Sequence, residues 1–181
     1  MKKLLVILPV VIMLAGCAPE AEDPLPAIPA GTYSVVLDAN SSTLTTDDST
    51  EPLQISLQAK ENSEVTYEVE IGAPCYLKTV DGYTEMIVKQ GAYFKSKSSY
   101  KVNRLICDIF EGKGINYEVH DKADGSGNAL ERHESSITPV YEADSGAVYE
   151  YDLNSSTEWS ITNSTKNKPA FYSVTIIFVV E

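Results

Sequence analysis

Apolar and polar residues alternate along most of the chain after residue 30, with the period of two that is typical of half-buried β-strands. Clear runs of this alternation lie at 53–60, 65–71, 105–109, 115–119, 147–153 and 159–161. Turn-forming residues such as Asp81-Gly82 separate the runs, and no segment has a convincing helical period. The pattern predicts an all-β domain of about ten strands, an antiparallel β-sandwich or a barrel, and we favour the sandwich.

Large aromatic residues occupy the inward positions of these runs. Tyr67, Tyr117, Tyr149 and Tyr151 share the phase of the aliphatic residues around them, so we expect them in the core and not as sugar-stacking rings on the surface. The last run, at 171–180, is apolar on both faces. It should therefore lie in the middle of a sheet.

A strand, a Ser/Thr-rich connection and an alternating strand follow one another between residues 33 and 59. This order is similar to the opening of bacterial immunoglobulin-like domains, and the resemblance implies a related sandwich. The Cys-Trp-Cys order of antibody domains is absent, because Trp159 follows both Cys75 and Cys107. We expect one β-sandwich domain over residues 31–181, since two smaller units would each be marginally stable.

The chain begins with Met1-Lys2-Lys3, an apolar run at 4–14 and the small residues Ala15-Gly16 before Cys17. That apolar run is eleven residues long, whereas a membrane-spanning helix needs about 20. The pattern therefore predicts a secretory signal peptide over residues 1–16. The sequence Leu14-Ala15-Gly16-Cys17 resembles the lipobox of bacterial lipoproteins. This resemblance implies cleavage before Cys17, a diacylglyceryl group on its thiol and acylation of the new amino terminus.

A lipidated Cys17 would anchor the protein to a membrane, because each buried methylene of an acyl chain contributes about 0.8 kcal/mol. Residues 17–30 hold the lipidated cysteine and a stretch rich in proline and acids, which we interpret as an extended tether. The resemblance places the protein in the cell envelope. Ala18 directly after the cysteine fits the outer-membrane pattern of enteric-type bacteria, with the domain facing the periplasm or the surface.

The chain has 181 residues and a formal net charge of -12, and 43% of it is hydrophobic. That much apolar surface can form a core, which argues against wholesale disorder. The negative charge argues against a nucleic-acid partner, which would need a basic face. The sequence contains no Gly-x-Ser-x-Gly, Walker or His-Glu-x-x-His motif, and we expect neither an enzyme nor a cofactor.

Three cysteines are present, and lipidation of Cys17 would leave Cys75 and Cys107 as an even pair. In an oxidising compartment the simple interpretation is a disulfide between them. The alternative is two separate buried thiols.

The local charge changes sign between Glu85 and Asp108, where no acid occurs. We call the basic and aromatic residues of this stretch the basic island; they are Lys89, Tyr93, Phe94, Lys95, Lys97, Tyr100, Lys101 and Arg104. Such a stretch is either a solvated surface or a binding site for an anionic ligand or an acidic partner. An acidic hairpin, with Glu142, Asp144, Glu150, Asp152 and Glu158, offers a complementary surface on a second copy.

Two features of the sequence partly resemble metal sites. Asp124-Gly125-Ser126-Gly127-Asn128 begins like a calcium loop, but position six is Ala129 and position twelve is Ser135, so a plain turn is favoured. His120 and His133 lack further ligands at zinc spacing and are expected at the surface.

The sequence therefore predicts a membrane-anchored envelope lipoprotein with a non-catalytic binding or assembly role. Its partner would be an envelope protein or surface component, bound through sheet edges or the basic island. The alternative is a carbohydrate- or metal-dependent ligand-binding module on the envelope.

Overall fold

The computed structural model describes residues 28–110, 116–140 and 146–181. The predicted signal peptide, Cys17 and most of the predicted tether lie outside the described residues, as do Glu142 and Asp144 of the acidic hairpin. The described part of the chain contains no helix that is long and apolar enough to cross a bilayer.

The fold is all-β, as predicted, with twelve strands in the described residues where about ten were expected. In chain order they are β1 (Gly31–Asp38), β2 (Leu53–Gln58), β3 (Thr66–Ile71), β4 (Cys75–Val80), β5 (Tyr83–Val88), β6 (Tyr93–Ser96), β7 (Lys101–Phe110), β8 (Glu118–His120), β9 (His133–Glu134), β10 (Gly146–Ser156), β11 (Ser160–Thr162) and β12 (Ala170–Val180). β9 was not expected from the sequence, because its two residues are too few to produce a periodic signal.

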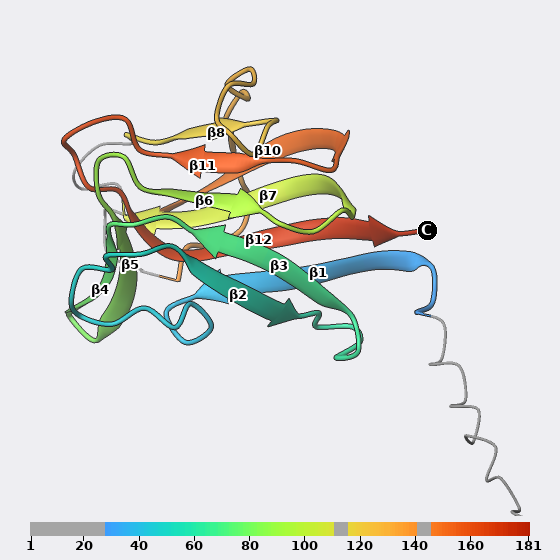
Figure 1. Ribbon diagram of the computed structural model, residues 1–181, viewed down its shortest axis with the longest axis horizontal. Helices are drawn as coiled ribbons and strands as arrows, with labels where there is room; N and C mark the ends of the chain where they lie inside the picture. Colours follow the sequence, from blue (N-terminus) through green and yellow to red (C-terminus); the bar gives the residue numbers. More distant parts are fainter. Residues whose placement is uncertain (1–27, 111–115, 141–145) are drawn as a thin grey trace, which may run out of the picture.

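The strands form two antiparallel sheets, which confirms the predicted sandwich (Figure 1). The seven-stranded sheet has the order β4-β5-β12-β7-β10-β9, and β1 also pairs with β12. The five-stranded sheet has the order β2-β3-β6-β11-β8. The final strand β12 lies between β7 and β1, so its predicted central position is confirmed.

Alternation along the strands directs one face of each sheet into a shared core. Tyr67, Tyr117, Tyr149 and Tyr151 are all buried there, as predicted. Trp159 is fully buried and its ring N–H donates a 3.0 Å hydrogen bond to the Tyr67 hydroxyl. Because a buried indole or phenol needs a partner for its polar atom, this pairing removes a cost of burial.

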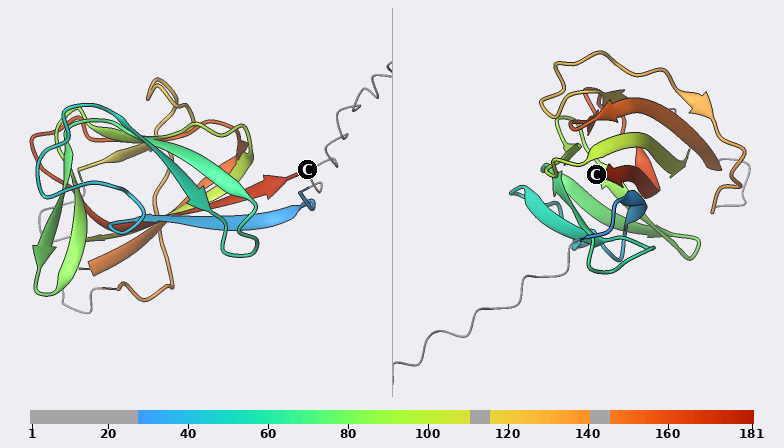
Figure 2. Two further views of the ribbon diagram at one scale, coloured as in Figure 1. Left: turned by 60° about the horizontal axis from the view of Figure 1, so that its bottom comes forward. Right: turned by 90° about the vertical axis from the view of Figure 1, so that its right-hand side faces the viewer.

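Different parts of the chain form the two ends of the sandwich. The β4–β5 hairpin lies at one end, and the C terminus lies at the other (Figure 1 and the left view of Figure 2). Asp81 and Gly82 form the predicted two-residue turn of this hairpin, and both have positive φ angles, of 50° and 87°. β1 begins at Gly31 near the C-terminal end, because Gly31 pairs with Val180.

Candidate functional site

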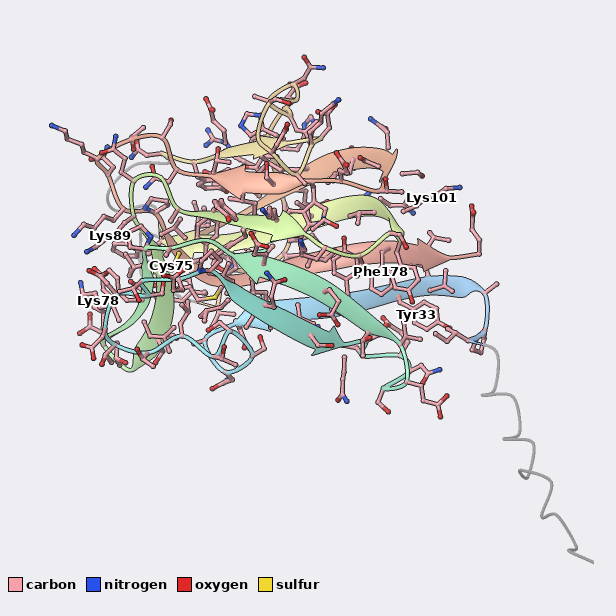
Figure 3. All side chains as sticks on the ribbon, viewed as in Figure 1. Tyr33, Cys75, Lys78, Lys89, Lys101 and Phe178 are labelled. Carbon is pink, nitrogen blue, oxygen red and sulfur yellow. The ribbon has the colours of Figure 1, made fainter. Side chains whose placement is uncertain are left out.

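The structure distributes the basic island over both sheets. Lys95 lies on β6 of the five-stranded sheet, whereas Lys101 and Arg104 lie on β7 of the seven-stranded sheet. Lys89 follows β5, and Figure 3 shows it at the opposite end of the molecule from Lys101. The residues are therefore close in sequence without forming one surface.

Glu70 on β3 gathers the island residues of the five-stranded sheet. Its carboxylate lies 2.7 Å from the Lys95 ammonium and 3.6 Å from that of Lys97. It also accepts hydrogen bonds of 2.7 Å from the Tyr93 hydroxyl and from the Gln54 side-chain amide. Burial acts to raise the pKa of Glu70, but the bonds from Lys95, Tyr93 and Gln54 outweigh it and lower the pKa to about 2.

The other island cations have acidic partners as well. The acids come from distant parts of the chain. The ion pairs are Lys89 with Asp48, Lys101 with Glu181 at 2.5 Å, and Arg104 with Glu150 at 2.9 Å and Asp152 at 3.4 Å. Arg104 thus pairs with two acids of the acidic hairpin in its own chain, between β7 and β10.

The aromatic members of the island do not form an exposed platform. Phe94 is fully buried and packs edge to face on Phe171, with the ring centroids 5.4 Å apart. Tyr93 is half-buried beneath Lys95, and Tyr100 is half-buried against Phe178. In the described residues every aromatic side chain is buried or half-buried, so a flat sugar-binding row is not seen there.

A second group of cations gathers at the β4–β5 end of the sandwich. We call it the lysine pole; its members are Lys78, Lys166 and Lys168, and Lys89 of the basic island lies beside them. Lys78 and Lys168 flank a hollow of about 120 Å³ whose wall also includes Glu85 and Ile87. Lys168 also lines an adjoining shallow hollow with Lys89 and Lys166. Figure 3 shows Lys78 and Lys89 together at this end.

The three members of the lysine pole have no ion-pair partner in the described chain. Within the described ranges, Lys78, Lys166 and Lys168 form no ion pair, and all three are exposed. Unpaired cations close to one another repel, and they attract any anionic surface that approaches. The lysine pole is therefore a local positive surface on a chain of net charge -12.

The loop that carries Lys166 and Lys168 is held in place by Asn163, whose side chain is buried. The Asn163 amide donates to the backbone oxygens of Val88, at 2.9 Å, and Asn167, at 2.7 Å. Its oxygen accepts from the backbone N–H and the hydroxyl of Thr165, at 2.9 and 3.1 Å. Because these bonds use both donors and both acceptor positions of the side chain, the loop has a defined conformation.

Sequence reasoning missed the lysine pole because its members are separated along the chain. Lys78 lies on β4 and Lys168 precedes β12, and the sheet brings them together because β5 lies between these two strands. The only local signal is the pair Lys166 and Lys168 in a short turn. That signal does not show whether acids from other strands neutralise the pair.

Cys75 and Cys107 are both free and buried in the structure. Cys75 lies on β4 and Cys107 on β7, with β5 and β12 between them in the same sheet. Three strand spacings of about 4.8 Å separate them by about 14 Å, whereas a disulfide needs Cα atoms within about 7 Å. The structure thus corresponds to the alternative of two separate thiols, and the predicted disulfide would require another strand arrangement.

The remaining candidate residues are engaged in local structure. Asp124 accepts hydrogen bonds from the backbone N–H and the hydroxyl of Ser126, at 2.9 and 2.6 Å, as in an Asx turn. His133 is exposed, as expected, but His120 is buried, with its Nδ1 3.1 Å from the Gly127 oxygen. Among the residues described, no three His, Cys, Asp or Glu side chains are grouped to hold a metal ion.

Two carboxyl groups are buried among the described residues on the outer face of the seven-stranded sheet. Glu85 accepts a 2.9 Å hydrogen bond from the Tyr172 hydroxyl. Asp108 accepts one of 2.9 Å from the Val140 backbone N–H, and burial raises the pKa of Asp108. The Glu85 bond joins β5 to β12 within the sheet, whereas the Asp108 bond fastens the segment at Val140 to β7.

Comparison of the chain with family models, curated proteins and solved structures finds no match.

Proposed function

We propose that the chain is a bacterial envelope lipoprotein whose β-sandwich binds an acidic envelope component at the lysine pole, without catalysis. The main support for this proposal is a difference in ion pairing between the two groups of cations. The cations of the basic island have acidic partners, whereas Lys78, Lys166 and Lys168 have none in the described chain. Electrostatic complementarity of this kind guides association and selects partners of opposite charge.

The proposed membrane anchor is supported by the predicted signal peptide and Cys17. Met1-Lys2-Lys3, the apolar run and Ala15-Gly16-Cys17 support export and lipidation. The tether would join the sandwich at Gly31, near the C-terminal end, and Figure 3 shows Lys78 of the lysine pole at the other end. Attachment to the membrane would therefore leave the lysine pole free for a partner.

Binding is tested with a matched pair of double variants of the tagged full chain, purified from bacterial membranes. Lys166→Glu with Lys168→Glu removes positive charge from the lysine pole. Lys60→Glu with Lys122→Glu makes the same charge change at exposed lysines elsewhere, which also lack an ion pair in the described chain. We expect the pole variant to recover about tenfold less of the acidic partner, and the control to recover a normal amount.

Added salt should weaken the wild-type complex, because it screens exposed charges. Equal partner recovery by both double variants, or a complex insensitive to salt, would contradict binding at the lysine pole. Lipidation is tested separately by labelling cells with radioactive palmitate. The chain should take up the label, and the Cys17→Ser variant should not.

A further inference from the structure

Within the described residues, the outer edge of β2 has no strand partner from Gln54 to Gln58, and β1 approaches it beyond that point, at Lys60. Ala59 N–H donates to Val65 O at 2.8 Å, which shows that the odd residues of this strand bond to β3. The even residues Gln54, Ser56 and Gln58 therefore direct their backbone N–H and C=O groups away from β3. In the described chain none of these six groups has a hydrogen-bond partner.

The edge of β1, by contrast, is closed. The Ser34 backbone oxygen accepts a 2.9 Å hydrogen bond from Lys60 N–H. The Ser34 N–H donates to the Glu61 carboxylate at 2.8 Å. Ser41 continues this protection, because its hydroxyl donates to Val36 O at 3.1 Å. These contacts occupy the positions that a further strand would need.

The edges of β4 and β8 are closed in the same way. Cys75 exchanges hydrogen bonds with Ser49, through the Ser49 N–H at 2.8 Å and the Ser49 hydroxyl at 2.9 Å. Leu130 N–H donates to Val119 O of β8 at 2.8 Å. Folded proteins commonly protect sheet edges by such coverage, or by charges and prolines. β2 has neither a charge nor a proline within it.

We propose that β2 pairs antiparallel with β2 of a second copy of this chain, about a two-fold axis at Ser56. In this register Ser56 faces Ser56 of the second copy, and Gln54 faces Gln58 of the second copy. These are the hydrogen-bonded positions of an antiparallel pair, so all six open backbone groups of each edge obtain partners. The two five-stranded sheets then become one continuous sheet.

The ends of β2 fit this register. Beyond Gln54 and Gln58, the next even positions are Pro52 and Lys60, and Ser34 of β1 already occupies the position beside Lys60. Proline has no N–H, and the Lys60 N–H is already bonded to Ser34 O. Pairing therefore stops at the same point at both ends without burying an unsatisfied donor.

The side chains of the edge also favour a second copy. Gln54, Ser56 and Gln58 are exposed and uncharged, so the residues that pair place no like charges opposite each other. The chain as a whole has a net charge of -12. Added salt should consequently strengthen the contact between copies by screening their general repulsion, whereas it should weaken binding at the lysine pole.

The direct test uses single cysteines in the full chain, treated with a mild oxidant in membranes and read on a non-reducing gel. Ser56→Cys places two thiols on the axis, at a Cα separation of about 5.5 Å that a disulfide can span. Gln58→Cys is the matched control on the same exposed face, because its counterpart in the second copy lies about 14 Å away. We expect Ser56→Cys to yield about tenfold more linked dimer than Gln58→Cys.

Absence of a Ser56→Cys dimer, or equal yields from both variants, would overturn the proposal. A disulfide-linked product whose mass differs from that of the dimer would show that the β2 edge binds a different protein. This result would also overturn the proposal. A second measurement uses charge at the axis. Ser56→Lys and Ser56→Glu should each be monomeric in sedimentation, and their mixture should form dimers. A mixture that stays monomeric contradicts pairing between copies.

Discussion

The basic island and the lysine pole contain the same kind of residue in different electrostatic settings. In the island, Lys95 and Lys97 share the carboxylate of Glu70, and Arg104 pairs with two acids of β10. In the pole, Lys78 and Lys168 line a common hollow with Glu85, whose carboxylate accepts a hydrogen bond from Tyr172, and neither lysine forms an ion pair in the described residues. A run of cations in sequence is thus neutralised in the fold, and scattered cations become a positive surface.

The comparison shows that pairing between strands decides the charge of a surface. Neighbouring strands bring in side chains that are far away in sequence, such as Glu70 beside Lys95 through the β3–β6 pairing. Oppositely charged residues placed across from each other stabilise a sheet modestly. A cation in such a pair also has little net positive charge left to attract an anionic ligand.

The largest expected effect is in the number of reactive thiols, which should rise from none in the folded chain to two in the unfolded chain. This number tests the strand order on which the comparison of island and pole depends. Cys75 and Cys107 lie on β4 and β7, the strands that carry Lys78 of the pole and Arg104 of the island. The lipidated mature chain should show two reactive thiols in denaturant without reductant. While folded it should show none, because burial raises the pKa of both thiols to about 12.

A count of zero thiols in denaturant would reveal the disulfide that the sequence predicts. It would also place β4 and β7 much closer than the structure does. Cys75→Ala provides the control, with one thiol expected.

Loss of the shared carboxylate should give the next largest effect. Glu70→Gln leaves Lys95 and Lys97 without their anion, and it should lower the free energy of unfolding by about 3 kcal/mol. Glu68→Gln is the control, because Glu68 lies on the same strand and forms no ion pair in the described chain. Urea unfolding measures both variants, and equal midpoints would show that the island is not held by Glu70.

The pH dependence of stability tests the same carboxylate without a substitution. The pKa of Glu70 is lowered from 4.5 to about 2 in the folded chain, so its stabilising contribution is present above pH 4.5 and is lost as the pH falls toward 2. After allowance for solvent screening, we expect a loss of about 2 kcal/mol over this interval. Glu70→Gln should remove this part of the dependence, and a variant with the wild-type slope would contradict the assignment.

A loss of stability similar to that of the pH effect is expected in the loop of the lysine pole. Asn163→Ala removes the four hydrogen bonds that hold residues 163–169, and it should cost about 2 kcal/mol. It should also weaken partner binding, although every lysine remains. Normal binding by a destabilised Asn163→Ala chain would show that the loop conformation does not matter for the pole.

Periodicity was sufficient to predict the sheets and much of their inner faces. The alternation at 53–59 and 65–71 correctly places Ile55, Leu57, Val65 and Val69 in the core, because a side chain's face depends only on its own strand. The same logic places Trp159 inside. Phe94 shows the limit, since a charge-based reading assigned it to a surface that the alternation of β6 directs into the core.

The candidate site could not be predicted in the same way, because it depends on which strands are neighbours. Glu70 and Lys95 are adjacent only through the β3–β6 pairing, and Lys78 approaches Lys168 only through β5 and β12. Local composition contains no information on these pairings. The open edge of β2 likewise becomes visible only when the closed edges of β1, β4 and β8 are known.

The central claim is that the lysine pole, and not the basic island, is the available cationic surface. Brief acetylation of the folded full chain, followed by mass spectrometry of its peptides, measures the availability of each lysine amine. Lys78, Lys166 and Lys168 should react several-fold faster than Lys95, whose pKa is raised by its hydrogen bond to Glu70 and whose amine is therefore protonated more completely. Equal or faster labelling of Lys95 would contradict the account.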